Sequence, residues 1–217
     1  MTAGPVTPGR DCPLCPRLVA FRAANRAAAP DWHNAPVPAF GPLDAPLLIV
    51  GLAPGRKGAN RTGRPFTGDF AGDLLFASLL RFGFAAGTYD KRPDDGLALR
   101  QARLTNAVRC VPPENKPTPQ ETAGCAGRFL AAEIAAMPRL RLILALGAIA
   151  HGAVLRVLGA RPAAFPFAHG AQHALPGGRR LVDSYHCSRQ NTNTGRLTAA
   201  MFDAVIAELR RQVDATG

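Results

Sequence analysis

The stretch Leu47-Leu48-Ile49-Val50-Gly51-Leu52-Ala53-Pro54-Gly55 places four consecutive large apolar side chains directly before a glycine-rich turn. Such a run is typical of a strand that is buried on both faces. Three further apolar runs, each followed by turn residues, occur at residues 104–108, 140–146 and 181–185. Helical patterns occur at residues 16–29, 70–82, 118–136, 148–158 and 196–213. The alternation predicts an α/β fold with a central, mostly parallel four-stranded sheet and helices on both faces.

Parallel sheets of this kind bind ligands at the carboxyl ends of their strands. We therefore expect the chemistry of the protein just after four residues that end apolar runs, which are Val50, Val108, Leu146 and Tyr185.

The chain of 217 residues is long enough for one sizeable core, and we expect a single domain over residues 1–217 with a flexible tail at residues 1–11. Its formal net charge of +11 creates a positive field, whose usual partner is a nucleic acid or another polyanion. The alternative is a solvated arginine-rich surface. No apolar stretch approaches the roughly 18 residues of a membrane span, and the first ten residues lack the pattern of a signal peptide. We expect a cytoplasmic monomer that does not contact membranes.

Four cysteines form a candidate metal-binding set. Cys12 and Cys15 are a C-x2-C pair, and Cys110 and Cys125 follow far along the chain. Four thiolates can close a tetrahedral site, and a cytosolic protein rarely keeps structural disulfides. The set suits zinc or an iron–sulfur cluster, and the spacing does not choose between them. In the alternative interpretation, the later two cysteines are unrelated buried thiols. Cys187 has no partner in this scheme.

The loop at residues 51–69 packs glycines among basic and amide side chains. Glycine lets the backbone approach a ligand closely, and exposed N–H groups suit phosphate or carbonyl oxygens. The loop does not have the pattern of a nucleotide-binding P-loop. Phe66 in this loop either stacks on a base or anchors the loop in the core. Asp69 is either the N-cap of the following helix or a carboxylate at the rim of the crevice, and both roles are compatible.

Two polar groups lie in or after later strands. Asn106 lies within the apolar run at residues 104–108, where a buried amide needs either an internal partner or the edge of a nucleobase. Residues 185–196 follow the last strand, and they are more polar than a turn that only packs against the core. His186 could donate a hydrogen bond to a leaving group, although a lone histidine is more often structural. Three residues of this segment could contact phosphates: Ser188, Asn191 and Arg196.

These residues together carry a resemblance to a known family. The stretches are Gly51-Leu52-Ala53-Pro54-Gly55, Asn60-Arg61-Thr62-Gly63-Arg64-Pro65-Phe66-Thr67-Gly68-Asp69, and His186 with the downstream Asn191-Thr192-Asn193-Thr194-Gly195-Arg196-Leu197-Thr198. With the four cysteines in order, they resemble the iron–sulfur branch of the uracil-DNA glycosylase superfamily, most closely its fifth family, type B. The resemblance covers nearly the whole chain.

The resemblance implies a structural four-iron, four-sulfur cluster on the four cysteines and DNA containing deaminated bases as the partner. It implies that Phe66 stacks on the extruded base, that Asn106 reads uracil, that His186 helps the base depart and that Asp69 is the acid near the sugar. The substrate-binding set is completed by Gly51, Ala53, Asn60, Ser188, Asn191 and Arg196.

Two positions depart from the family pattern. Ala53 stands where the best-studied members place a water-activating aspartate, and Cys187 replaces the proline of the usual His-Pro-Ser motif. We therefore expect a monofunctional glycosylase in base excision repair, in which stabilisation of the leaving group by His186 dominates. The resemblance suggests substrates beyond uracil that include hypoxanthine, xanthine and etheno adducts. The alternative is a non-catalytic nucleic-acid-binding module held together by zinc.

Overall fold

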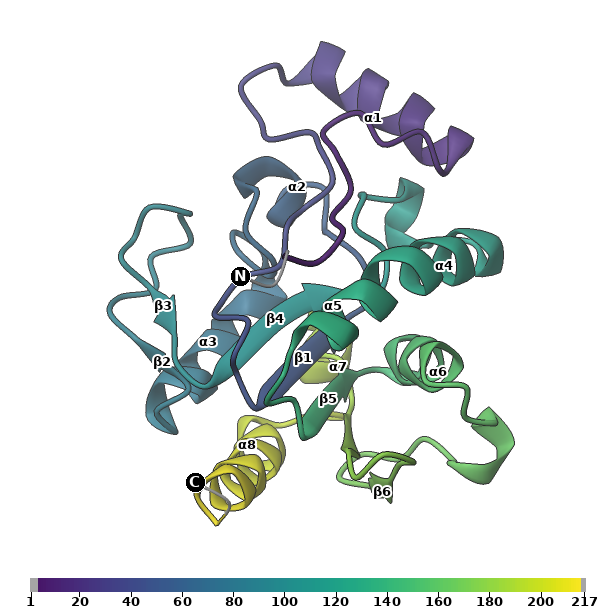
Figure 1. Cartoon of the computed structure of the whole chain (residues 1–217). Coiled ribbons are helices and arrows are strands. Elements are labelled where there is room, and N and C mark those ends of the chain that lie inside the picture. Colours follow the sequence, from purple (N-terminus) through teal and green to yellow (C-terminus); the bar gives the residue numbers. More distant parts are fainter. Residues whose placement is uncertain (1–3, 216–217) are drawn as a thin grey trace.

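The computed structural model describes residues 4–215 and is built around a five-stranded sheet (Figure 1). The strands lie in the order β4 (Ala102–Asn106), β1 (Leu47–Gly51), β5 (Leu142–Leu146), β7 (Arg180–Ser184) and β6 (Gln172–Ala174). The first four pair in parallel, and β6 pairs antiparallel with β7. The predicted α/β class and mostly parallel sheet are confirmed, and the sheet has five strands rather than four.

Helices cover both faces of the sheet, as predicted. Alternate residues of β1 point to opposite sides, because successive side chains of a strand alternate. Leu47 and Ile49 pack in the core with α3 (Phe70–Arg81) and α8 (Ala199–Asp214). Leu48 and Val50 pack in a second core with α5 (Ala131–Ala136) and α6 (Ala148–Val157).

Several elements differ in detail from the prediction. The predicted helix at 118–136 consists of α4 (Pro119–Cys125), a π-helical turn (Ala126–Leu130) and α5, and it begins with a capping box between Thr118 and Glu121. The last helix begins at Ala199, three residues later than predicted, because Thr198 caps it. The remaining elements are α1 (Pro16–Ala28), α2 (Ala59–Thr62), α7 (Arg189–Asn193), the two-residue strands β2 (Ala85–Ala86) and β3 (Ala98–Leu99), and 3-10 turns at Pro113–Asn115 and Pro162–Ala164.

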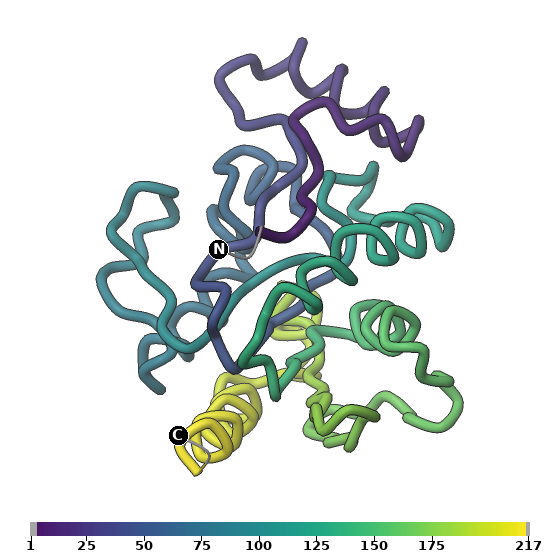
Figure 2. Tube along the Cα trace, in the orientation of Figure 1, coloured from purple at the N-terminus to yellow at the C-terminus, as the bar shows by residue number. Residues whose placement is uncertain are grey.

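The purple amino-terminal segment, which includes α1, lies at the top of the view, at the opposite end from the yellow carboxyl-terminal helix (Figure 2). Residues 1–3 of the predicted flexible tail lie outside the described residues. Within the described part, Arg26 of α1 donates hydrogen bonds to the Asp11 carboxylate and to the carbonyl of Arg10. None of the helices among residues 4–215 has the length and apolar character that crossing a membrane requires.

A buried charge cluster ties strand β4 to helix α5. The Glu133 carboxylate is fully buried, and it pairs with Arg103 and, at 2.7 Å, with Arg109. Removal of one partner from a buried ion pair leaves uncompensated charge in a medium of low dielectric constant.

We predict that Glu133→Gln lowers the free energy of unfolding by about 3–5 kcal/mol, because it strips both arginines of their countercharge. The matched control is Glu208→Gln, whose partner Arg211 is largely exposed; it should cost under about 1 kcal/mol. Chemical denaturation followed by circular dichroism measures both, and equal losses in the two variants would show that the buried cluster contributes no more than a surface pair.

Candidate active site

The carboxyl ends of the four parallel strands meet at one edge of the sheet. Gly51 at the end of β1 pairs in register with Asn106 at the end of β4. Gly147 follows β5, and a Cβ atom placed on it lies 3.6 Å from the Cβ of His186, which follows β7. The strand ends therefore bring residues that are far apart in sequence into one neighbourhood.

Gly51 allows two side chains to approach the backbone closely. A Cβ atom placed there would lie 2.4 Å from Cζ of Phe66 and 2.5 Å from Oδ1 of Asn106, closer than atoms can pack. Any other residue at this position would displace one of them. The structure thus gives Gly51 a packing role that keeps Phe66 and Asn106 together.

Phe66 has one of the two roles that the sequence left open, because it anchors the loop in the core. Its side chain is buried in the core with Leu47 and Ile49, and only 6% of it is exposed. Its ring also stacks on His186, with centroids 5.9 Å apart and planes 28° apart. Its backbone has a φ of +57°, which costs a bulky residue about 1–3 kcal/mol and requires support from its surroundings.

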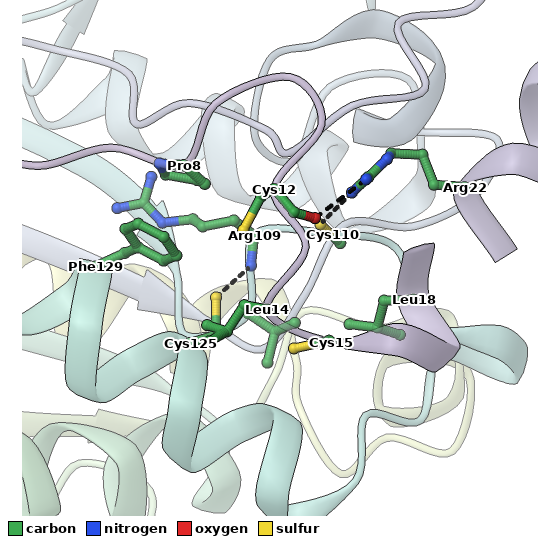
Figure 3. Close-up of a pocket in the computed structure, with 11 residues that line it drawn as sticks. Pro8, Cys12, Leu14, Cys15, Leu18, Arg22, Arg109, Cys110, Cys125 and Phe129 are labelled. Atoms are coloured by element: carbon green, nitrogen blue, oxygen red, sulfur yellow. Dashed lines mark hydrogen bonds between the residues drawn. The ribbon is translucent and has the colours of Figure 1, made fainter. Parts of the chain in front are cut away.

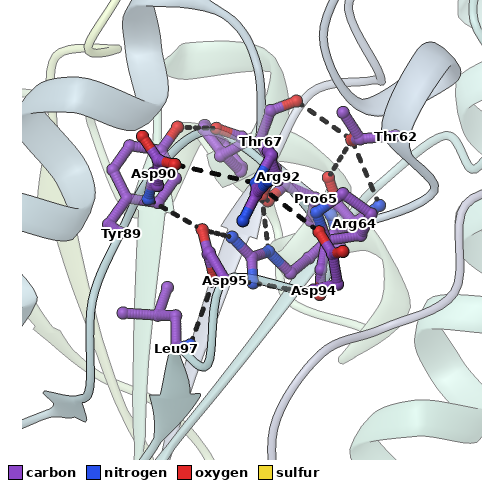
Figure 4. Close-up of polar contacts among 12 residues, drawn as sticks. Thr62, Arg64, Pro65, Thr67, Tyr89, Asp90, Arg92, Asp94, Asp95 and Leu97 are labelled. Atoms are coloured by element: carbon purple, nitrogen blue, oxygen red, sulfur yellow. Dashed lines mark hydrogen bonds and ion pairs between the residues drawn. The ribbon is translucent and has the colours of Figure 1, made fainter.

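Arg64 supplies that support (Figure 4). Its guanidinium binds both carboxylate oxygens of Asp95, at 2.8 and 2.7 Å, and its Nε donates to the Thr67 hydroxyl at 2.7 Å. The pairing with Arg64 lowers the pKa of Asp95 well below its usual range. The Tyr89 hydroxyl donates to the Phe66 carbonyl at 3.3 Å. The guanidinium also lies 5.3–5.9 Å from the centroids of three rings, those of Phe40, Phe76 and Tyr89.

Asn106 presents an unpaired acceptor to the site. The residue is 3% exposed, and its Oδ1 has no hydrogen-bond partner among the described residues. A buried carbonyl oxygen without a donor costs about 1–3 kcal/mol. The cost is recovered when a ligand supplies an N–H group at this position.

His186 is an uncharged imidazole at neutral pH. Burial lowers its pKa from 6.5 to about 4, because the charged form is poorly solvated there. A neutral imidazole carries one N–H donor and one acceptor nitrogen. The side chain can therefore donate a hydrogen bond without bringing a formal charge into the site.

The residues after His186 shape its loop. Ser188 caps α7 by accepting from the backbone N–H of Asn191. The Asn191 amide in turn donates to the carbonyl of His186 at 2.9 Å. Arg196 is exposed, and its guanidinium lies 4.6 Å from the ring centroid of Tyr185. Of the three residues predicted to contact phosphates, Ser188 and Asn191 hold the histidine loop, and Arg196 is directed over an aromatic ring.

Asp69 is the N-cap of α3, which is one of its two predicted roles. Its Oδ1 accepts from the backbone N–H of Gly72 at 3.3 Å. The other oxygen lies under the loop, since Cβ atoms placed on Gly55 and Gly58 would be 2.8 and 2.4 Å from it. Burial raises the pKa of Asp69. Burial, with a smaller contribution from the Asp69 charge, raises the pKa of Cys187 in the histidine loop.

Two predicted substrate-binding residues contact other parts of the fold. Asn60 is 1% exposed, and its amide donates to the side chain of Asn34 at 2.9 Å. This hydrogen bond joins the loop at residues 51–69 to the segment that follows α1. Ala53 packs against the apolar cluster that contains Cys125. Contact of these two residues with substrate stays a prediction.

The four predicted cysteines converge on one pocket (Figure 3). Cys12 and Cys15 come from the segment before α1, whereas Cys110 follows β4 and Cys125 ends α4. Their apolar neighbours include Leu18, Val108 and Phe129. Burial raises the pKa of Cys110 to about 11 and that of Cys125 to about 12, so both stay protonated unless a cation stabilises the thiolates.

Cationic side chains surround the same pocket. Nη1 of Arg22 lies 3.6 Å from the sulfur of Cys110. Arg109 also lines the pocket, and its buried Nε and Nη1 have no partners among the described residues. Donors of this kind suit an anionic metal–thiolate group. The residues present therefore fit a metal group bound by four thiolates.

We predict that His186 stays neutral at pH 5.5. A histidine with the ordinary pKa of about 6.5 is roughly nine-tenths protonated there, whereas the lowered pKa keeps the proton off until pH falls towards 4. Imidazole nitrogen shifts in protein labelled with ¹⁵N-histidine measure this, with His186→Asn used to assign the signal. A titration midpoint near 6.5 for this signal contradicts the buried, neutral imidazole.

Comparison with known proteins agrees with the resemblance in the motifs. The family model described as the uracil DNA glycosylase superfamily matches residues 38–210. A type-5 uracil-DNA glycosylase of Thermus thermophilus is 50% identical over 206 residues, which cover 92% of this chain and 93% of that protein. Type-5 uracil-DNA glycosylases of Mycobacterium bovis and Pyrobaculum aerophilum are 43% and 42% identical; the matches cover 92% and 90% of this chain and 77% and 86% of those proteins. The chain belongs to the uracil DNA glycosylase superfamily.

Proposed function

We propose that this protein excises uracil from DNA, with Asn106 reading the base, Phe66 stacking on it and His186 stabilising its departure. As a member of its family the protein is a hydrolytic DNA N-glycosylase of base excision repair. The observation that carries the residue assignment is the buried, unpaired Oδ1 of Asn106 near Phe66, whose ring contacts His186.

Asn106 has the chemistry to recognise a deaminated base. Uracil presents an N3–H donor next to the O4 acceptor, and a carboxamide offers the complementary acceptor and donor. Cytosine presents the reverse order, with an acceptor at N3 and donors at N4. The unpaired Oδ1 of Asn106 is thus matched by uracil and left unsatisfied by cytosine. Hypoxanthine and xanthine carry the same N–H and C=O edge, which supports their inclusion in the substrate range.

The geometry also limits where the base can lie. A base sandwiched between two rings needs about 3.5 Å on each face, or about 7 Å between the ring planes. The centroids of Phe66 and His186 are only 5.9 Å apart. The base therefore stacks on Phe66 beside the histidine, and the imidazole meets an edge of the base.

This placement suits His186 to stabilise the leaving group. Cleavage of a deoxyribosyl bond develops negative charge on the base and positive charge on the sugar. The N–H group of a neutral imidazole, held in a buried site, stabilises the departing anion without reorganisation. Asp69 complements it by stabilising the cationic sugar and orienting water. With Ala53 in the first motif, no carboxylate is supplied from that position.

We predict that His186→Ala slows single-turnover excision of uracil by about 10²- to 10³-fold, the usual cost of removing one preorganised donor. Abasic sites are scored after alkali treatment of a duplex with one uracil, in the presence of a metal chelator. Retained iron content is the control for folding. A loss below about threefold removes the histidine from the mechanism.

We predict that Asn106→Ala reduces excision of uracil and hypoxanthine by about 10- to 100-fold, since one buried polar contact is lost. Etheno adducts lack the N–H group of the lactam edge, so their excision, where measurable, should fall far less. The two substrate classes are compared in one preparation, which makes each the control for the other. Equal losses on both show that the asparagine is structural.

We also propose that Cys12, Cys15, Cys110 and Cys125 bind a [4Fe-4S] cluster. The shared pocket and the neighbouring arginines support it. When bound, the cluster supplies a cross-link among three chain segments and no redox step in base removal. The net charge of +11 supports a polyanionic partner, and we propose that a single copy of the chain binds DNA.

We predict that anaerobically purified protein is brown and that Cys110→Ser loses the colour and most of its iron and sulfide. The matched control is Cys187→Ser, a buried cysteine outside the pocket, which should keep the full iron content. Colourless wild-type protein that holds one zinc ion contradicts the cluster and favours the zinc-stabilised binding module.

A further inference from the structure

A second group of metal-binding side chains lies outside the active site and the cysteine pocket. It joins His151 of α6, His173 of β6 and Asp183 of β7. Nδ1 of His151 is 2.7 Å from one oxygen of Asp183, and Nε2 of His173 is 3.1 Å from the other. The side chains of His151, His173 and Asp183 are 5%, 11% and 0% exposed.

Both ring nitrogens of His151 face hydrogen-bond acceptors, which favours a cation at one of them. Its Nδ1 faces the Asp183 carboxylate, and its Nε2 lies 2.8 Å from the carbonyl oxygen of Phe165. Both neighbours are acceptors, whereas a neutral imidazole has only one N–H group. When Nε2–H donates to Phe165, a nitrogen lone pair is left facing a carboxylate oxygen. Either a second proton or a metal ion that binds both atoms removes this conflict.

The arrangement matches a common form of metal site. A metal-binding histidine usually donates its other N–H group to a backbone carbonyl or carboxylate, which fixes the tautomer. Phe165 provides that carbonyl for His151. Two phenylalanine rings also pack edge-on against the histidines, Phe167 on His151 at 5.6 Å and Phe165 on His173 at 5.8 Å. The imidazoles are therefore held in place by contacts that do not involve the proposed ion.

The three side chains lie close enough to bind one ion after a small rearrangement. The two ring nitrogens flank the carboxylate, and all the ligand atoms lie within 4.8 Å of one another. Two atoms that each lie about 2.0–2.1 Å from a tetrahedral zinc ion are about 3.4 Å apart. The contacts of 2.7 and 3.1 Å to Asp183 therefore open when the ion enters, by about 0.3–0.7 Å.

We propose that His151, His173 and Asp183 bind one zinc ion, with water completing the coordination. Two imidazole nitrogens and one carboxylate favour zinc over magnesium or calcium, which prefer oxygen ligands. The ion ties the short edge strand β6 to β7 and α6. Asp183 precedes His186 by three residues, so the ion also braces the strand that leads to the active-site histidine.

The test is zinc uptake by the cluster-loaded, full-length protein. The protein is dialysed against low-micromolar zinc, and zinc and iron are measured in the same sample. We expect one zinc per chain with no loss of iron. Asp183→Asn and His173→Gln should weaken zinc binding about tenfold or more, whereas His169→Gln, a nearby histidine outside the group, should not. Wild-type protein that takes up no more zinc than these two variants overturns the proposal, as does zinc uptake that displaces iron.

A second readout covers the case in which Asp183→Asn does not fold. Zinc at about ten times its dissociation constant should raise the thermal midpoint of the wild type by about 3–6 °C. His173 lies on the edge strand, and His173→Gln should remove this shift. A shift of the same size in His173→Gln places the ion elsewhere and contradicts the proposal.

Discussion

The close approach of Phe66 and Asn106 across Gly51 is the constraint on which the site depends. The in-register pairing of β1 with β4 puts Gly51 beside Asn106, and the absence of a Cβ atom leaves space for the ring of Phe66. The histidine loop after β7 then completes the group by stacking His186 on that ring. Much of the surrounding polar structure serves to hold Phe66 there, because its backbone conformation is unfavourable and the Arg64–Asp95 pair anchors its loop.

Burial of the side chains at this edge of the sheet determines their protonation and hydrogen bonding as well as their packing. It keeps His186 neutral, raises the pKa of Asp69 and leaves the Asn106 carbonyl without a donor. Of these, the buried carboxylate of Asp69 and the unpaired oxygen of Asn106 are unfavourable in the free protein. We propose that the base and the positive charge that develops on the sugar relieve them. The loop after β1 also contacts the cysteine pocket, because Ala53 packs against the apolar cluster that contains Cys125. We propose that the iron–sulfur cluster thereby stabilises this loop.

Sequence alone predicted the architecture well, since apolar runs and helical spacing mark the buried strands and helices directly. Strand β6 was missed because Gln172-His173-Ala174 has no apolar pattern and exists through its pairing with β7. The hydrogen bond between Asn60 and Asn34 could not be predicted, because no local spacing links the two residues. For the same reason the histidines at 151 and 173 carried no signal, although the fold brings them to one aspartate. Motifs thus locate a site, and only the tertiary contacts show which motif residues face inward.

The central claim is that Asn106 Oδ1 receives its missing hydrogen bond from the extruded base. The most direct measurement is a crystal structure of the protein with DNA containing 2′-fluoro-2′-deoxyuridine, in which the fluorine slows cleavage by disfavouring positive charge on the sugar. The account predicts N3 of the base about 2.7–3.2 Å from Oδ1 of Asn106, with the base stacked on Phe66. An extruded base that leaves this oxygen without a donor would contradict it.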